Sequence, residues 1–168
     1  NPLLTASQYA MEGISHRCCH PDLVFLIDIT EGSGFTRDNC ETHITEFMTE
    51  TLKRARQHKC DNVQASVVEY GKVARLRWNF NKYTSYHDLY HALRNYSPKS
   101  SVGNINHARS AFTAVRKLIE EPHRGKRDGS PTWVFWLVKS TPYEATVLQS
   151  YVNHVIKPRA YVVVVAVG

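Results

Sequence analysis

The sequence predicts a single α/β domain with a mostly parallel central sheet, one antiparallel edge strand and helices on both faces. The chain has 168 residues, which is enough for one domain and too few for two. Short continuous apolar runs, typical of strands buried on both faces, alternate along it with amphipathic helical patterns. One further segment alternates apolar and polar residues, as a half-exposed antiparallel strand does.

The elements are expected in a regular order after a lead-in segment at residues 1–21, so the domain itself spans 22–168. Strands are expected at 23–27, 63–70, 132–138 and 160–167, the first and the last two as fully buried runs, and the alternating strand at 74–80. Helices are expected at about 44–55, 85–96, 106–121 and 144–155. Apolar residues recur three or four positions apart in each helix, so one face of each should pack on the sheet.

Composition and motifs exclude several classes of protein. The formal charge of +6 favours anionic partners, and the longest apolar run, Tyr161 to Val167, is far shorter than the roughly 20 residues that span a bilayer. No phosphate-binding glycine loop and no nucleophile elbow is present. We therefore expect no enzymatic activity, no cofactor, no nucleic-acid partner and no membrane insertion.

Three motifs in order resemble the von Willebrand factor A domain: residues 22–32 (DLVFLIDITEG), residues 67–71 (VVEYG) and the Val102-Gly103 turn before a helix. The resemblance covers about residues 22–168 and is strongest to matrix-type modules such as those of collagen VI alpha chains. It implies a Rossmann-like fold and a non-enzymatic protein–protein interaction and assembly module. It further implies secretion into the extracellular matrix, with other matrix proteins or neighbouring subunits of the same assembly as partners.

The resemblance also implies a metal-ion-dependent adhesion site, but this chain departs from its pattern. Asp28 and Thr30 match the first two ligand positions, whereas Gly32, Ile105 and Ser140 stand where the family has Ser, Thr and Asp. A hard cation such as Mg²⁺ needs oxygen ligands, which Gly32 and Ile105 do not offer. The expected site is degenerate and holds no metal, with Asp28 and Thr30 bonded to loop amides.

The alternative is a working adhesion site that binds a ligand carboxylate through Mg²⁺, held by Asp28, Thr30 and Ser140. Asn104 and Asn106 would supply carbonyl oxygens if the loop register differs by one residue, whereas Lys139 places a positive charge nearby.

A second alternative is a zinc hydrolase built on His87 and His91, which lie four residues apart on one face of a helix. The Glu that such enzymes carry between the two histidines is absent. A solvated polar helix face is therefore the preferred interpretation.

A basic loop and a sequon are the remaining surface motifs. Arg124, Lys126 and Arg127 are expected either as plain solvated charge, as a site for heparan sulfate or an acidic partner, or as a cleavage site after Arg127. Asn95 begins the Asn-Tyr-Ser glycosylation sequon, usable if the chain is secreted.

The cysteines at 18, 19, 40 and 60 allow three fully paired connectivities. In the topology of the family, Cys18 or Cys19 should lie at the same end of the sheet as Cys60, so these are the disulfide candidates. Cys40 is expected at the far end of a helix, too distant from Cys60 to pair. One of the two adjacent cysteines remains for an interchain bridge.

The family fold continues beyond residues 160–167 with further helices and a last strand that this sequence lacks. The chain is therefore expected to be a C-terminally incomplete fragment, with Tyr161–Val167 as a bare apolar edge that recruits another strand.

Overall fold

A computed structural model describes residues 20–30, 37–57, 60, 62–99, 103, 105–139 and 142–166 of this chain. In this part, five strands form one sheet in the order β3-β2-β1-β4-β5. The strands are β1 (Asp22–Asp28), β2 (Gln64–Tyr70), β3 (Ala74–Trp78), β4 (Thr132–Val138) and β5 (Tyr161–Ala166). Neighbouring strands are parallel except β2 and β3, which form an antiparallel hairpin. The predicted α/β class and the antiparallel edge strand are confirmed.

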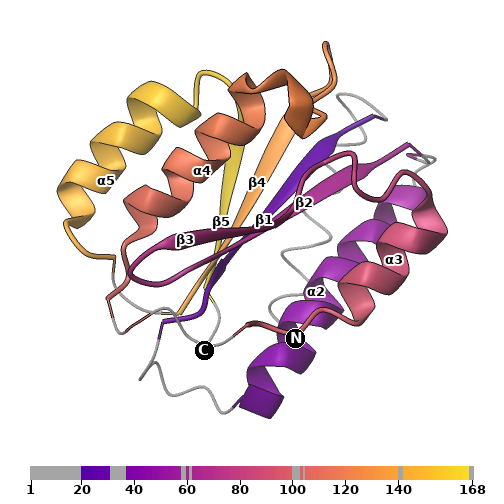
Figure 1. Cartoon of the computed structure of the whole chain (residues 1–168), viewed down its shortest axis with the longest axis horizontal. Helices are drawn as coiled ribbons and strands as arrows, with labels where there is room; N and C mark the ends of the chain where they lie inside the picture. The colour runs from indigo at the N-terminus through magenta and orange to yellow at the C-terminus, as the bar shows by residue number, and fades with distance from the viewer. Residues whose placement is uncertain are drawn as a thin grey trace.

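In the described part of the chain, helices cover both faces of the sheet (Figure 1). Helices α2 (Arg37–Gln57) and α3 (Tyr86–Arg94) lie together on one face, and α4 (Ala108–Glu120) and α5 (Ala145–Tyr151) lie on the other. The helix expected at 144–155 is divided, because α5 passes into a π-helical turn at Val152–Ile156. A short 3₁₀ turn, Pro122–Arg124, precedes β4.

The central strand explains the two hydrophobic cores, because every residue of β1 is buried. Leu23, Phe25 and Ile27 point into the core under α2 and α3, whereas Val24 and Leu26 point into the core under α4 and α5. This two-sided burial is what a continuous apolar run predicts for a central parallel strand.

The expectation that the strand at 160–167 is buried on both faces is wrong. Strand β5 pairs only with β4 among the described residues, and it lies at the edge of the sheet. Val164 is 61% exposed and Tyr161 is 40% exposed, while Val165 is buried. An edge strand has one neighbour fewer than a central one, so an apolar run alone does not guarantee burial.

The loops that follow β1, β2 and β4 meet at one edge of the sheet. The Ile29 amide donates to the Tyr70 carbonyl at 2.9 Å, and the His107 amide donates to the Gly71 carbonyl at 2.9 Å. The Tyr143 amide donates to the Asn106 carbonyl at 2.7 Å. These bonds tie the ends of three strands to the start of α4 and so fix the position of the candidate site.

Within the described ranges, no helix combines the length and the apolar character needed to cross a bilayer.

Candidate functional site

Asp28, the last residue of β1, is buried with 0% exposure beneath the loops at this edge. Its Oδ1 accepts a hydrogen bond from the Thr30 amide at 2.9 Å and another from the Thr30 hydroxyl. Its Oδ2 accepts from Nδ2 of Asn106 at 3.1 Å and from the Lys139 amide at 3.0 Å. Both oxygens of the carboxylate are therefore satisfied by donors of the protein itself, which offsets the cost of burying the charge.

The donors come from three separate elements: Thr30 follows β1, Asn106 precedes α4 and Lys139 follows β4. Asn106 is 4% exposed, and its amide nitrogen, a donor, faces Asp28. The sequence singled out Asn106 only as a source of carbonyl oxygen for a cation. Its donor role requires the tertiary fold, because Asp28 and Asn106 are 78 positions apart.

Ile105, which stands at the family's Thr position, is 40% exposed and offers no ligand atom. Gly32, Asn104, Ser140 and the Val102 of the quoted turn lie outside the described residues, so their parts in the expected site stay predictions. Of the residual adhesion-site positions, the structure places Asp28 and Thr30 together.

Tyr70, at the end of β2, lies beside Asp28 on the neighbouring strand. It is completely buried, pairs with Asp28 in the β1–β2 register, and its hydroxyl accepts from Nε1 of Trp136 at 2.8 Å. Burial and then the negative charge of Asp28 raise the pKa of Tyr70 well above its usual value. This phenol therefore stays neutral, and its hydroxyl takes part in the site through hydrogen bonds.

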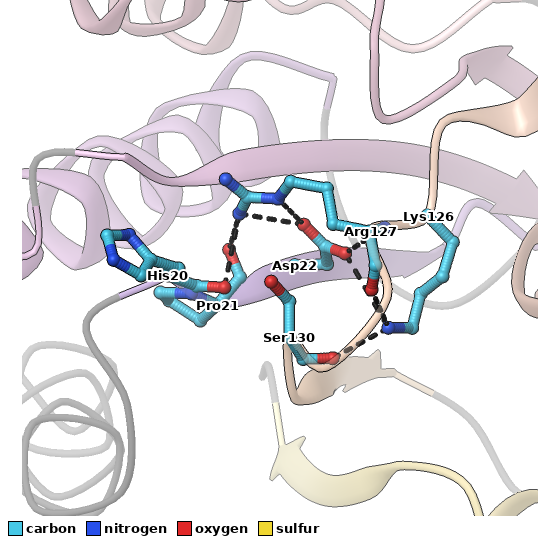
Figure 2. Close-up of polar contacts among 6 residues, drawn as sticks. All are labelled: His20, Pro21, Asp22, Lys126, Arg127 and Ser130. Atoms are coloured by element: carbon cyan, nitrogen blue, oxygen red, sulfur yellow. Dashed lines mark hydrogen bonds and ion pairs between the residues drawn. The ribbon is translucent and has the colours of Figure 1, made fainter.

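The expected basic loop is held against the start of β1 at the opposite end of the strand (Figure 2). Arg127 donates from its amide to Oδ2 of Asp22 at 3.0 Å and from Nε to Oδ1 at 2.9 Å. Nζ of Lys126 donates to the carbonyls of Arg127 and Ser130 at 2.7 and 2.6 Å. Arg124 forms an ion pair with Glu121 at 2.8 Å. All three cations thus have intramolecular partners, and their polyanion or cleavage role stays a prediction.

Gly125 allows this loop geometry. Its φ of +86° is a left-handed conformation that disfavours other residues, and a Cβ there would lie 2.6 Å from Cβ of Asn81. Asp22 itself has 0% exposure, and burial raises its pKa although the hydrogen bonds and charges of Arg127 and Lys126 act in the opposite direction. This buried pair was not predicted from the sequence, because a lone Asp before a strand has no partner nearby in the chain.

The remaining sequence-predicted residues lie elsewhere. His87 and His91 are exposed on α3 with ring centroids 4.4 Å apart, and no group of three or more potential metal ligands occurs among the described residues. Asn95 is exposed at the C-terminal cap of α3, so the sequon is accessible, and its glycosylation stays a prediction.

Cys60 is buried with 1% exposure just before β2. Its expected partners, Cys18 and Cys19, lie outside the described residues, as does most of the lead-in segment. The disulfide therefore stays a prediction.

Comparison with solved structures shows that a matrix protein of the mussel byssus shares this fold. Proximal thread matrix protein 1 from the mussel byssus matches in one crystal form with a TM-score of 0.75, at 13% identity over 89% of this chain and 38% of that one. A structure of the same protein "with zinc occupied MIDAS motif" matches with a TM-score of 0.64, at 19% identity over 90% of this chain and 37% of that one. A third structure has a TM-score of 0.64 at 17% identity. These likenesses show the fold, and this chain spans under two-fifths of the length of those neighbours.

No curated protein matches the chain by sequence. The family model described as "von Willebrand factor type A domain" matches residues 22–168, nearly the whole chain. Domains of this family are generally non-catalytic adhesion modules that mediate protein–protein interactions. Strand order, the edge at which the loops meet and the family match agree, and the chain belongs to the von Willebrand factor type A domain family.

Proposed function

We propose that this domain is a non-enzymatic interaction and assembly module of an extracellular matrix protein, of the collagen VI type, with a degenerate metal-ion-dependent adhesion site. Its partners are other matrix proteins or neighbouring subunits of the same assembly. The domain binds them without a bridging cation.

One observation supports this proposal above the others: the protein's own donors occupy the carboxylate of Asp28. Four hydrogen bonds, from Thr30, Asn106 and Lys139, use both oxygens. A cation at this position would have to displace the Asn106 amide or the Lys139 amide, and Ile105 offers it no replacement ligand. Displacing hydrogen bonds to a buried carboxylate costs roughly 1.5–3 kcal/mol each, which lowers the affinity for Mg²⁺.

The extracellular location is supported by the fold neighbours, which are matrix proteins of the byssus. A secreted location also agrees with an accessible sequon at Asn95 and with the cysteines before β1 and β2.

The alternative is metal-dependent adhesion through Asp28, Thr30 and Ser140, with a ligand carboxylate completing the coordination of Mg²⁺. It is favoured by one observation, the zinc-occupied site reported for the structural neighbour. Asp28 and Thr30 keep the first two positions of that motif in this chain.

Calorimetric titration of the purified domain with Mg²⁺ alone separates the two. We expect no heat of binding, and we expect the thermal midpoint of unfolding to be the same with millimolar Mg²⁺ and with EDTA. Saturable binding with a stoichiometry near one, abolished in Asp28→Asn, would overturn the proposal in favour of metal-dependent adhesion. Zn²⁺ is titrated in parallel with His87→Gln, so that binding at the histidines is not mistaken for binding at Asp28.

A further inference from the structure

Several cations of this domain are held by carboxylates: Arg75 and Arg77 contact Glu69, and Arg127 contacts Asp22. Among the described residues, Arg109 on α4 instead lies over the ring of Tyr151, 5.5 Å from its centroid. Two cations near the end of α2 stand together over tyrosine rings of α3. The guanidinium of Arg56 lies 4.5 Å from the ring centroid of Tyr86, and Nζ of Lys53 lies 5.7 Å from that of Tyr90.

A tyrosine ring orients a cation without cancelling its formal charge. Lys53 and Arg56 are both exposed, and no carboxylate of the described residues lies within ion-pair distance of either. Tyr86 and Tyr90 stack on each other with centroids 6.1 Å apart, so the two tyrosines form a fixed base for the two cations. The result is a pair of preoriented, uncompensated positive charges facing solvent.

Lys53 and Arg56 lie on one side of α2, and two polar side chains of α3 lie near them. Lys53 and Arg56 are three positions apart on one helix, so they are separated by about 4.5 Å along the axis and lie on the same side. His87 and His91, exposed on α3 beside Tyr90, each carry at least one ring N–H donor at neutral pH. We call this surface the α2–α3 ridge: Lys53, Arg56, Tyr86, Tyr90, His87 and His91. It is found where α2 and α3 lie side by side in Figure 1.

We propose that the α2–α3 ridge binds a sulfated polysaccharide, with Lys53 and Arg56 as the principal contacts. A polymer with a permanent charge on successive sugars meets both cations at once, and the histidine N–H groups donate to neighbouring sulfate or hydroxyl oxygens. This choice rests in part on the proposed extracellular location, where such polymers are the abundant polyanion.

Two features of the ridge favour a polysaccharide over a nucleic acid or an apolar peptide. Proteins that bind single-stranded nucleic acid offer open aromatic faces on which bases stack, whereas Tyr86 and Tyr90 already have a cation on a face and stack on each other. The exposed side chains of the ridge are Lys53, Arg56, His87 and His91, which offer positive charge and hydrogen-bond donors. An apolar peptide would leave these groups without partners.

The ridge also differs from the loop that the sequence singled out for polyanions. Arg124, Lys126 and Arg127 each have an intramolecular partner, and their side chains are 25%, 17% and 23% exposed. A polyanion would have to displace those partners before it met the loop. At the ridge it displaces only water.

The test is a titration of the purified domain with a heparin oligosaccharide of defined length, at several salt concentrations. We expect saturable binding near physiological ionic strength, and weak or no binding of the same oligosaccharide after complete desulfation. The double variant Lys53→Gln/Arg56→Gln should bind roughly tenfold more weakly, since two exposed charge contacts are lost. In a plot of the logarithm of the binding constant against the logarithm of salt concentration, the slope should become shallower by about one unit per lost contact.

A matched control removes the same charge elsewhere: Lys82→Gln/Lys157→Gln, whose residues are exposed outside the ridge. The affinity of the control variant for the oligosaccharide should fall less than twofold. The variant Lys53→Arg/Arg56→Lys keeps both charges, and its affinity should also stay within twofold of the unaltered domain. Unchanged thermal midpoints show that every variant folds. The proposal is overturned if the ridge variant loses no more than the control, if heparin does not bind, or if single-stranded DNA of equal charge binds as tightly.

The titration requires neither a metal nor a protein partner. A negative heparin result would therefore not affect the interpretation of the Mg²⁺ titration at Asp28. Likewise, binding of Mg²⁺ would not contradict the proposal for the ridge.

Discussion

Nε of Arg127 donates to Oδ1 of Asp22 at 2.9 Å, although the two residues are 105 positions apart in the sequence. The side chain of Asp22 has no exposure to solvent. The pair joins the loop before β4 to the first residue of β1, the central strand (Figure 2). A buried carboxylate is tolerated only when it is paired and hydrogen-bonded.

Arg127→Gln should therefore destabilise the domain by roughly 3 kcal/mol at pH 7, the lower end of the range for breaking a buried pair, because Arg127 is partly exposed. Burial already raises the pKa of Asp22 above 3.8, and loss of Arg127 raises it further. A raised pKa in the folded state means that stability falls as pH rises through that pKa. The loss of stability in the variant should be largest at neutral pH and should shrink as the pH falls and Asp22 takes up a proton.

Urea unfolding of both proteins at several pH values checks this prediction. Arg124→Gln, which removes a partly exposed ion pair with Glu121 from the same loop, is the control and should lose about 1 kcal/mol or less, with little difference between pH values. Equal deficits for Arg127→Gln at pH 4 and pH 7 would contradict the assigned role of Asp22.

If the site at Asp28 is metal-independent, as we propose, Asn106→Asp should make it metal-dependent. It replaces the amide donor 3.1 Å from Asp28 with a second carboxylate, and two buried like charges at that distance should cost roughly 2–4 kcal/mol. Mg²⁺ should recover much of this loss because it neutralises both oxygens. The measurement is the thermal midpoint with and without Mg²⁺.

Asn106→Leu is the companion variant, since it removes the same hydrogen bond without adding charge. It should be destabilised and gain nothing from Mg²⁺. If Mg²⁺ stabilises the unaltered domain as much as it stabilises Asn106→Asp, the site already binds the cation.

Glu69 is a second buried anchor, and Glu69→Gln should loosen the segment that follows α3. Its carboxylate, with 0% exposure, accepts from Arg75 and Arg77, from the Tyr96 hydroxyl at 2.9 Å and from the Lys99 amide at 3.3 Å. Removing its charge deprives the guanidinium groups of Arg75 and Arg77 of their carboxylate partner, at a cost of roughly 3 kcal/mol. Hydrogen exchange should accelerate first at residues 95–99.

Arg54→Gln is the control for that prediction, because it breaks the partly exposed pair of Arg54 with Glu50 on α2. Such i,i+4 pairs contribute about 0.3–0.5 kcal/mol. A Glu69→Gln protein as stable as Arg54→Gln would show that the network around Glu69 contributes little.

Strand β5 should drive self-association of the isolated domain at tens of micromolar. It is an apolar, uncharged edge with Val164 61% exposed. Val164→Lys should reduce association because a charge at an edge opposes pairing with another strand. Val147→Lys, at an exposed position on α5, is the control and should leave association unchanged.

Light scattering measured over a range of protein concentrations tests this self-association. A domain that stays monomeric without the substitution would show that the edge is protected, and our expectation of a bare edge that recruits a further strand would then be wrong.

Local pattern was sufficient to predict the elements and their class. The run at 23–27 is apolar at every position, and in the structure each of these residues is buried because both sheet faces carry helices. The alternation from Ala74 to Trp78 predicted an antiparallel strand, and the structure pairs it with β2. Strand and helix periods depend on neighbouring residues in the chain, so one sequence is enough to detect them.

What the sequence could not determine was which polar groups meet. It placed Asp28 at a strand end and marked Arg124, Lys126 and Arg127 as an accessible loop. Only the tertiary structure put the Asn106 amide on Asp28 and the guanidinium of Arg127 on Asp22, through pairs 78 and 105 positions apart. The apolar run at β5 predicted a strand buried on both faces, whereas the structure places it at the edge of the sheet, as the strand order of the resembled family implied, because burial depends on how many strands lie beside it. Such contacts are set by strand order and by loop closure over long separations, and no local period encodes them.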